Sequence, residues 1–175
     1  NFINKFGESL NQNVKLANYS WFNIGGKAKY FFKPKNKNEL IEFLKETKKN
    51  DIKTTFLGAG SNTLFRDNGY KGAVIKLGKN FKYIKQIKND TLEVGAATPD
   101  HMVASFAKDN SLANFEFLSC IPGSIGGAII MNSGCFDNDI SKILISIQVI
   151  DKEKCQEFEI QSEDIKFVYR GTNLS

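Results

Sequence analysis

One stretch of the sequence, FLSCIPGSIGGAIIMNSGC at residues 117–135, restricts the possible folds more than any other. It contains four glycines and one proline, yet apolar residues flank it on both sides. Loops are usually polar at the surface, and a helix interior rarely contains this much glycine. Gly123, Gly126 and Gly127 leave space where side chains would otherwise stand. We therefore expect either a flat ligand or another backbone segment to pass close to this stretch.

A second glycine segment, LGAGSN at residues 57–62, follows the β-type run KTTFL directly. Gly58 and Gly60 permit positive φ angles and allow backbone N–H groups to point at an anion, while Ser61 and Asn62 add donors. The alternative is a tight turn at the end of a strand. The segment matches neither the P-loop nor the dinucleotide-binding glycine pattern, so those two sites are not supported.

The longer stretch predicts a short helix that begins near Ser124 and has this serine as its N-cap. Such a helix would direct free N–H groups and its positive dipole end at whatever lies before it. The alternative is a close contact between helix and sheet that the glycines make possible. We prefer the interpretation that the two glycine segments, about sixty residues apart, converge on one diphosphate.

The first half of the chain predicts a strand–helix–strand order. Residues 36–51 read as a helix with Asn38 as N-cap and an apolar stripe of Leu40, Ile41 and Leu44. KTTFL and GAVIKL read as the β-type runs that follow it.

The second half predicts a strand at 91–97 and a helix at 99–110, opened by Thr98 as N-cap and Pro99 as first residue. Met102, Val103 and Phe106 form the expected buried face of this helix. Residues 142–151 and 155–160 predict a hairpin. This alternation favours an α+β or α/β fold with two lobes that divide near residue 76.

Composition excludes several classes of protein. The 41% hydrophobic content and fifteen phenylalanines indicate a packed globular domain, and no apolar run approaches the roughly 20 residues of a membrane span. The N-terminal stretch has no apolar core of a signal peptide, and three cysteines without C-x-x-C spacing favour reduced thiols in the cytosol. With His101 as the only histidine, we expect no metal site. The net charge of +5 fits either a lysine-rich surface or an anionic partner.

Four segments together resemble one enzyme family. NYSWFNIGGKA (18–28), LGAGSNTLFRDNGYKGAVI (57–75), FLSCIPGSIGGAIIMNSGCF (117–136) and FVYRGTNL (167–174) resemble, in the same order, the flavin-binding region of the UDP-N-acetylenolpyruvoylglucosamine reductases. The longest of these segments is the most specific, and the four matches extend over almost the whole chain.

The resemblance implies a two-lobed α+β FAD-binding fold of the vanillyl-alcohol-oxidase (PCMH) type over residues 14–170. Lobe one would span about 14–75 and lobe two about 76–170, with non-covalent FAD held between them. The implied cofactor-binding residues are Gly58, Ala59, Gly60, Ser61, Asn62, Thr63, Ala96, Ser119, Ile121, Pro122, Gly123, Ser124, Gly126 and Gly127.

The resemblance also implies a reaction. NADPH would reduce FAD, and the flavin would pass hydride to the enolpyruvyl group of UDP-N-acetylglucosamine enolpyruvate in cytoplasmic peptidoglycan synthesis. Arg170 lies at the family's catalytic arginine position, with Tyr169 before it, and a guanidinium suits a developing charge beside a carboxylate. Without the resemblance, Arg170 would read as a surface arginine at a strand end.

The sequence departs from the family pattern after Arg170. The family's later serine segment, which supplies a proton, and its C-terminal glutamate have no counterpart, so residues 171–175 would begin a substrate-binding domain that is missing. We expect neither nucleic-acid nor membrane binding. The alternatives are another FAD-dependent oxidoreductase of the same fold and a basic nucleic-acid-binding domain.

Overall fold

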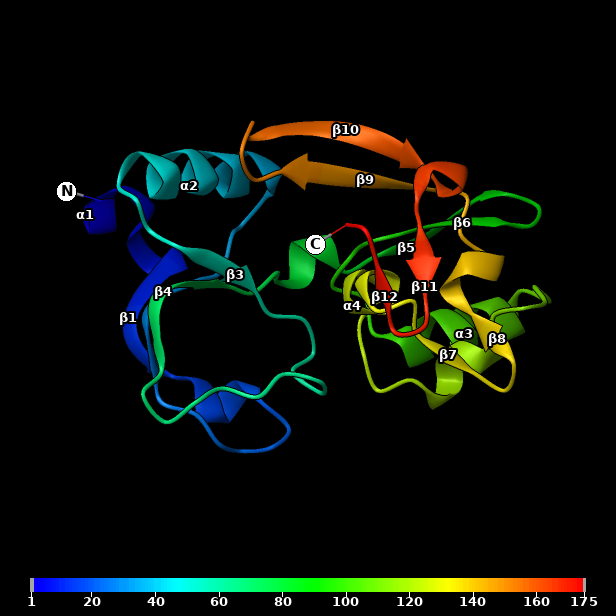
Figure 1. The fold of residues 1–175 in the computed structure, drawn as a ribbon. Coiled ribbons are helices and arrows are strands. Elements are labelled where there is room, and N and C mark those ends of the chain that lie inside the picture. Colours follow the sequence, from blue (N-terminus) through cyan, green and yellow to red (C-terminus); the bar gives the residue numbers. More distant parts are fainter. Residues whose placement is uncertain (1, 175) are drawn as a thin grey trace. The chain divides into compact units, whose positions relative to one another are not determined.

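The computed structural model describes residues 2–174, which form two compact units. Unit 1 contains the residues up to Asn80 together with Ile150–Glu157, and unit 2 contains Phe81–Val149 together with the residues from Phe158 onward. Helices and strands alternate in both units (Figure 1), which confirms the expected mixture of helix and sheet.

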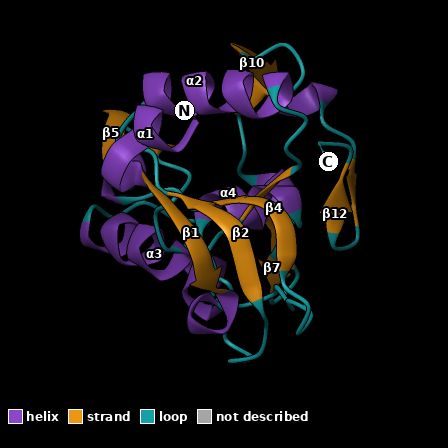
Figure 2. Cartoon of the chain, turned by 90° about the vertical axis from the view of Figure 1, so that its left-hand side faces the viewer, coloured by secondary structure: helices purple, strands orange, loops and turns teal. Residues whose placement is uncertain are grey.

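Unit 1 is built on a four-stranded sheet in the order β1-β2-β4-β3. β1 is antiparallel to β2, and β2 runs parallel to β4 (Figure 2). β3 also runs parallel to β4. Its elements are α1 (Phe2–Phe6), η1 (Gly7–Ser9), β1 (Leu10–Lys15), η2 (Leu16–Tyr19), β2 (Lys27–Phe32), α2 (Lys37–Lys49), β3 (Thr54–Phe56) and β4 (Tyr70–Ile75).

Aromatic packing holds α1 and α2 against the sheet. The rings of Phe32 and Phe43 stack with their centroids 3.7 Å apart, and Phe6 meets both rings edge-on. Fully burying a phenylalanine stabilises a fold by roughly 1.5–3 kcal/mol, so this cluster anchors both helices. A second cluster, made of Leu16, Ala28, Phe31, Leu57 and Val74, contains residues from η2, from two strands and from the loop after β3.

The helix at 36–51 is confirmed, but its predicted N-cap is wrong. α2 begins one residue after Asn36, whose side chain accepts a hydrogen bond from the N–H of Glu39. The side chains buried by α2 are Leu40, Phe43, Leu44 and Thr47. Ile41 is only half-buried, because the stripe that faces the sheet is turned toward Phe43.

The helices of unit 2 pack around one hydrophobic core. Its elements are η3 (Lys79–Phe81), which begins at the end of unit 1, β5 (Ile84–Lys88), β6 (Thr91–Val94), α3 (Asp100–Asp109), η4 (Glu116–Cys120), α4 (Ile125–Ile130), β7 (Gly134–Cys135), β8 (Asn138–Asp139), η5 (Ile140–Lys142), η6 (Ser162–Asp164), β11 (Phe167–Val168) and β12 (Gly171–Thr172). The core consists of Val103, Phe117, Leu118, Ala128 and Ile140. β9 (Ser146–Asp151) and β10 (Gln156–Gln161) form the predicted hairpin, whose tip belongs to unit 1.

The start of α3 also differs from the prediction. The helix begins at Asp100, and the Thr98 hydroxyl does not cap it but exchanges hydrogen bonds with the backbone of Tyr83. Val103 is buried as expected, whereas Met102 is 38% exposed and Phe106 is half-buried. The helix is rotated relative to the predicted face, and Ala107 takes the inner position.

Candidate functional site

The carboxyl ends of three parallel strands meet at one edge of the unit 1 sheet. The register aligns the last residues of these strands, which are Phe32, Phe56 and Ile75. The chain leaves them through Lys33, through the loop at 57–63 and through Lys76 respectively. Ligands of open sheets with parallel strands bind outside the carboxyl ends, so this edge is the candidate site of unit 1.

The loop at 57–63 is held by the segment that follows η2. The Ser20 hydroxyl donates to the Thr63 carbonyl at 2.7 Å, and the N–H of Trp21 donates to the Gly60 carbonyl at 3.0 Å. Gly60 has a φ of +80°, and a Cβ atom there would stand 2.0 Å from the Tyr19 carbonyl oxygen. This glycine is therefore required for the close approach of the two segments, independently of any ligand.

The same loop carries a row of free donors. Within residues 2–174, the backbone N–H groups of residues 58–63 donate no hydrogen bond to another group of the protein. Gly58, Ala59 and Asn62 are exposed to solvent. Successive N–H groups without partners are the feature by which turns bind anions. The predicted residues 58–63 therefore form one donor set that fits a diphosphate.

A lysine pair adds positive charge beside this loop. Lys76 Nζ donates to the Gly58 carbonyl at 2.5 Å, and burial lowers the pKa of Lys76, with the nearby Lys33 lowering it further. Sequence reasoning missed both lysines, since neither differs from the many others in a lysine-rich chain. Both lysines directly follow parallel strands, and only the register of the sheet shows that they lie at the same edge.

In unit 2, the segment 123–126 runs antiparallel to residues 96–100. Asp100 donates its N–H to the Gly123 carbonyl, and the N–H groups of Ile125 and Gly126 donate to the carbonyls of Thr98 and Ala96. The first two N–H groups of α4 are therefore not free, contrary to the expectation for this helix. A Cβ on Gly126 would lie 3.1 Å from the Ala96 oxygen, so close backbone packing explains this glycine.

Some donors of this segment remain available. Within the described residues, the Ser124 hydroxyl and the N–H groups of Ser124 and Gly127 have no hydrogen-bond partner in the protein. Ser124 occupies the predicted N-cap position, but its side chain does not cap the helix. A Cβ on Gly127 would meet only the Ser124 oxygen, at an ordinary 3.7 Å. Gly127 is thus a glycine that internal packing does not require.

A buried carboxyl group lies beneath Gly123. Asp100 is fully buried, neither of its carboxyl oxygens has a hydrogen-bond partner among the described residues, and burial raises its pKa to about 7. One of these oxygens stands 2.6 Å from the position that a Cβ on Gly123 would take. Gly123 therefore leaves space for Asp100. An aspartate in the first turn of a helix is common, so the sequence contained no sign of this contact.

The segment before Pro122 presents its side chains outward. Ser119 and Pro122 are exposed and Ile121 is half-buried, while Phe117 and Leu118 of the same segment lie in the core. The Ser119 hydroxyl donates to the Glu116 carbonyl at 2.7 Å. Ser119, Ile121 and Pro122 are therefore accessible to a ligand, as a cofactor-lining role requires.

Tyr169 and Arg170 form the two-residue turn between β11 and β12. Arg170 has a φ of +59°, its guanidinium carbon lies 5.3 Å from the centre of the Tyr169 ring, and both side chains are exposed. Hydrogen bonds from Asn132 to Val168 and from Thr172 to Ile130 attach this hairpin to the end of α4. The hairpin therefore carries an exposed cation on the same unit as the segment 119–127.

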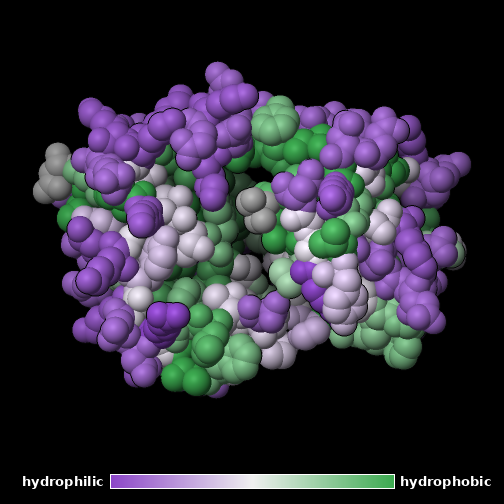
Figure 3. Space-filling model, in the orientation of Figure 1, coloured by the Kyte–Doolittle hydropathy of each residue, from purple (hydrophilic) through white to green (hydrophobic). Residues whose placement is uncertain are grey.

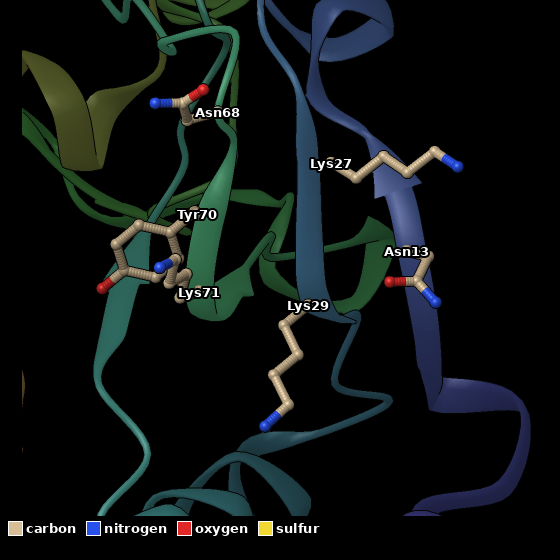
Figure 4. A pocket seen from close by; sticks show the side chains of 6 residues that line it. All are labelled: Asn13, Lys27, Lys29, Asn68, Tyr70 and Lys71. Carbon is tan, nitrogen blue, oxygen red and sulfur yellow. The ribbon is translucent and has the colours of Figure 1, made fainter.

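Unit 1 has a shallow basic hollow on its sheet (Figure 4). The hollow has a volume of about 340 Å³ and is lined by Asn13, Lys27, Lys29, Asn68, Tyr70 and Lys71. Among the described residues, none of these three lysines forms an ion pair. The side chains are exposed apart from Tyr70, and the buried polar atoms without partners in residues 2–174, which belong to Ser9 and Asp100, are not part of the lining.

An apolar patch also reaches the surface of unit 1. Trp21, Phe22, Ile24 and Leu64 are each at least half exposed. The first three belong to the segment that follows η2, and Leu64 directly follows the donor loop. The patch is visible at the lower left of Figure 3. Within the described residues, no cluster of His, Cys, Asp and Glu suits a metal ion, and no helix is long and apolar enough to cross a membrane.

Residues 28–154 match the FAD binding domain family. The chain is 44% identical over 173 residues to the UDP-N-acetylenolpyruvoylglucosamine reductase of Pelagibacter ubique (strain HTCC1062). This alignment covers 99% of the chain but only 57% of the relative, so the chain spans little more than half the length of the protein it matches.

Solved structures have the same fold. The crystal structure of UDP-N-acetylenolpyruvylglucosamine reductase from Thermus caldophilus matches with a TM-score of 0.78 and 26% identity, over 94% of this chain and 57% of that one. A VAO-type flavoprotein from Myceliophthora thermophila matches with a TM-score of 0.59 and 16% identity, over 77% of this chain and 26% of that one. The predicted α+β fold of the vanillyl-alcohol-oxidase type is confirmed.

Proposed function

The chain belongs to the family of FAD-binding domains, and we propose that it is the FAD-binding part of a UDP-N-acetylenolpyruvoylglucosamine reductase. The observation that carries this proposal is the row of free N–H groups at 58–63 beside Lys76, at the carboxyl edge of parallel strands. The curated relatives and the Thermus caldophilus structure support the choice of reductase.

The residues present fit the cofactor. A diphosphate requires several donors and positive charge, and unit 1 offers both in residues 58–63 and Lys76. Unit 2 offers the Ser124 hydroxyl and the N–H groups of Ser124 and Gly127, while Ser119, Ile121 and Pro122 are accessible to the flavin. We propose that each unit contributes its own set of contacts to FAD. When bound, FAD supplies the hydride carrier that this chain lacks.

Arg170 supplies a fixed positive charge in this proposal. Its guanidinium is always protonated, and its planar donors match a carboxylate in two parallel hydrogen bonds. The turn conformation and the contact with Tyr169 hold it at the tip of the β11–β12 hairpin. There it would bind the carboxylate of the enolpyruvyl group and stabilise negative charge that develops beside it.

We further propose that NADPH is the reductant and UDP-N-acetylglucosamine enolpyruvate the substrate, with UDP-N-acetylmuramate as product for peptidoglycan synthesis. A cytoplasmic location is consistent with three free thiols that form no disulfide.

The visible absorption spectrum of the protein, before and after addition of FAD, tests the binding proposal. We expect the two absorption bands of a bound flavin and retention of FAD through gel filtration. NADPH oxidation that UDP-N-acetylglucosamine enolpyruvate stimulates in the full-length protein then tests the reaction. Flavin binding without this stimulation would favour another oxidoreductase of the same fold.

The basic hollow motivates the remaining alternative, which is nucleic-acid binding. Lys27, Lys29 and Lys71 would contact phosphates there, and such binding weakens steeply as salt concentration rises. A colourless protein that binds RNA or DNA in this salt-dependent way would contradict the flavin proposal.

A further inference from the structure

Two cysteines of unit 2 lie next to each other at the surface. Cys120 is the last residue of η4 and is exposed, and Cys135 is the last residue of the two-residue strand β7 and is half-buried. β7 packs directly against η4, which brings together residues that are fifteen positions apart in the sequence. The Cys120 side chain lies close enough to Cys135 to act on its thiol. Both cysteines are free thiols in this structure.

The Ser119 hydroxyl contacts the sulfur atom of Cys120. The Ser119 hydroxyl donates its proton to the Glu116 carbonyl, so its oxygen is left to accept from the Cys120 thiol, 3.7 Å away. Burial raises the pKa of the Cys135 thiol and the contact with Cys120 raises it further, while the guanidinium of Arg170 acts in the opposite direction. The pair therefore has one exposed thiol and one partly shielded thiol near a cation.

The third cysteine differs in every respect. Cys155 is 5% exposed, lies in the turn between β9 and β10, and directs its thiol to the Lys152 carbonyl. It thus provides an internal control for reactivity.

We propose that Cys120 and Cys135 are a site of reversible oxidation, at which hydrogen peroxide converts the two thiols into an intramolecular disulfide. Cys120 reacts first because it is exposed: its sulfur attacks one peroxide oxygen, the O–O bond breaks, and a sulfenic acid and one water form. Cys135 then attacks the sulfenic sulfur, an S–S bond forms, and a second water leaves. The two sulfur atoms together lose two electrons, and the peroxide is reduced to two waters.

The disulfide would lock η4 to β7. The bond requires Cα atoms roughly 4.4–6.8 Å apart, and η4 and β7 are in direct contact. η4 also carries Ser119, and the charge of Arg170 acts on the Cys135 thiol, so oxidation would affect the surroundings of residues that we assign to the cofactor and substrate. The chemistry itself does not depend on FAD, and the proposal stands apart from the proposed function.

Peroxide treatment of the purified protein, followed by intact mass and peptide mapping, tests this proposal. We expect the mass to fall by two hydrogen atoms, a peptide link between Cys120 and Cys135, and free thiols of the denatured protein to decrease from three to one. Dithiothreitol should restore the original mass. The rate should not depend on protein concentration, since the reaction occurs within one chain.

Three serine variants separate the pair from the rest of the chain. Cys155→Ser should form the disulfide as the unchanged protein does, whereas Cys120→Ser and Cys135→Ser should not form it. Circular dichroism serves as the folding control for all three. Disulfides only between separate molecules, a link that involves Cys155, or overoxidation of Cys120 without any link to Cys135 would each overturn the proposal.

Discussion

Asp100 makes the stability of unit 2 depend on pH. Its carboxyl group is buried without a hydrogen bond, and desolvation raises its pKa from 3.8 to about 7. The folded state then retains a proton that the unfolded state releases between about pH 4 and pH 7. Stability therefore falls as the pH rises through that window, and remains low above it.

We expect Asp100→Asn to remove this pH dependence. The neutral amide mimics the protonated acid, so the variant should be more stable than the unchanged protein above about pH 7, by at most about 4 kcal/mol. Urea unfolding at acidic and at alkaline pH measures the effect. Asp109→Asn, at the exposed end of the same helix, is the matched control. Equal pH slopes in the two variants would contradict the assignment.

The Lys76 side chain provides a second test at a single residue. If its ammonium group approaches the diphosphate as we propose, Lys76→Met should weaken FAD binding by roughly ten- to a hundredfold, since a hydrogen bond to a charged group contributes about 1.5–3 kcal/mol. Flavin titration measures the change. Lys45→Met, at an exposed position of α2, should leave the affinity unaltered. An unchanged affinity in the folded Lys76 variant would remove this lysine from the site.

At the scale of elements, the glycines of the two candidate segments have different roles. Gly60 adopts a positive φ and lies against the Tyr19 backbone, so Gly60→Ala should destabilise unit 1 by a few kcal/mol even without FAD. A loss of FAD binding in this variant would therefore not by itself demonstrate a contact.

A substitution at Gly127 separates an effect on FAD binding from an effect on stability. A Cβ there has ordinary space and lies within α4, so Gly127→Ala should maintain or raise stability, by up to about 1 kcal/mol. If FAD approaches this backbone, the same variant should nevertheless bind FAD more weakly. Thermal unfolding and flavin titration, done side by side, measure both effects. A more stable variant with undiminished FAD affinity would exclude close approach at this position.

At the scale of the whole molecule, we expect FAD to be held without a covalent bond. His101 is exposed on α3, outside the segments that resemble the family motifs, and the Cys120 and Cys135 side chains interact with each other. Heating or acid should release all flavin into the supernatant, as absorbance shows after the denatured protein is removed. Yellow colour that stays with the precipitate would indicate a covalent link.

The elements predicted well are those in which local pattern is strong. α2 and the β9–β10 hairpin follow from periodic apolar residues, and β3 and the loop after it follow from an apolar run stopped by glycine. β1 and β2 were not predicted. In β1, which has the sequence LNQNVK, only Leu10 is buried and the strand lies at a sheet edge, so its polar residues gave no strand pattern. The N-cap of α2 lies two residues before the predicted one because Asn36 and Asn38 both suit that position, whereas the N-cap of α3 is Pro99 because the Thr98 hydroxyl bonds to Tyr83.

For the candidate site as well, some features follow from the sequence and others only from the tertiary structure. The sequence alone identified the glycine segments, the Tyr169–Arg170 pair and the family resemblance, because backbone freedom and donor chemistry are local properties. The position of Lys76 at a parallel strand end, the burial of Asp100 under Gly123 and the pairing of Cys120 with Cys135 were decided by tertiary structure alone. Each depends on sheet register or on packing between distant segments, and the desolvation that changes these groups arises only when those segments meet.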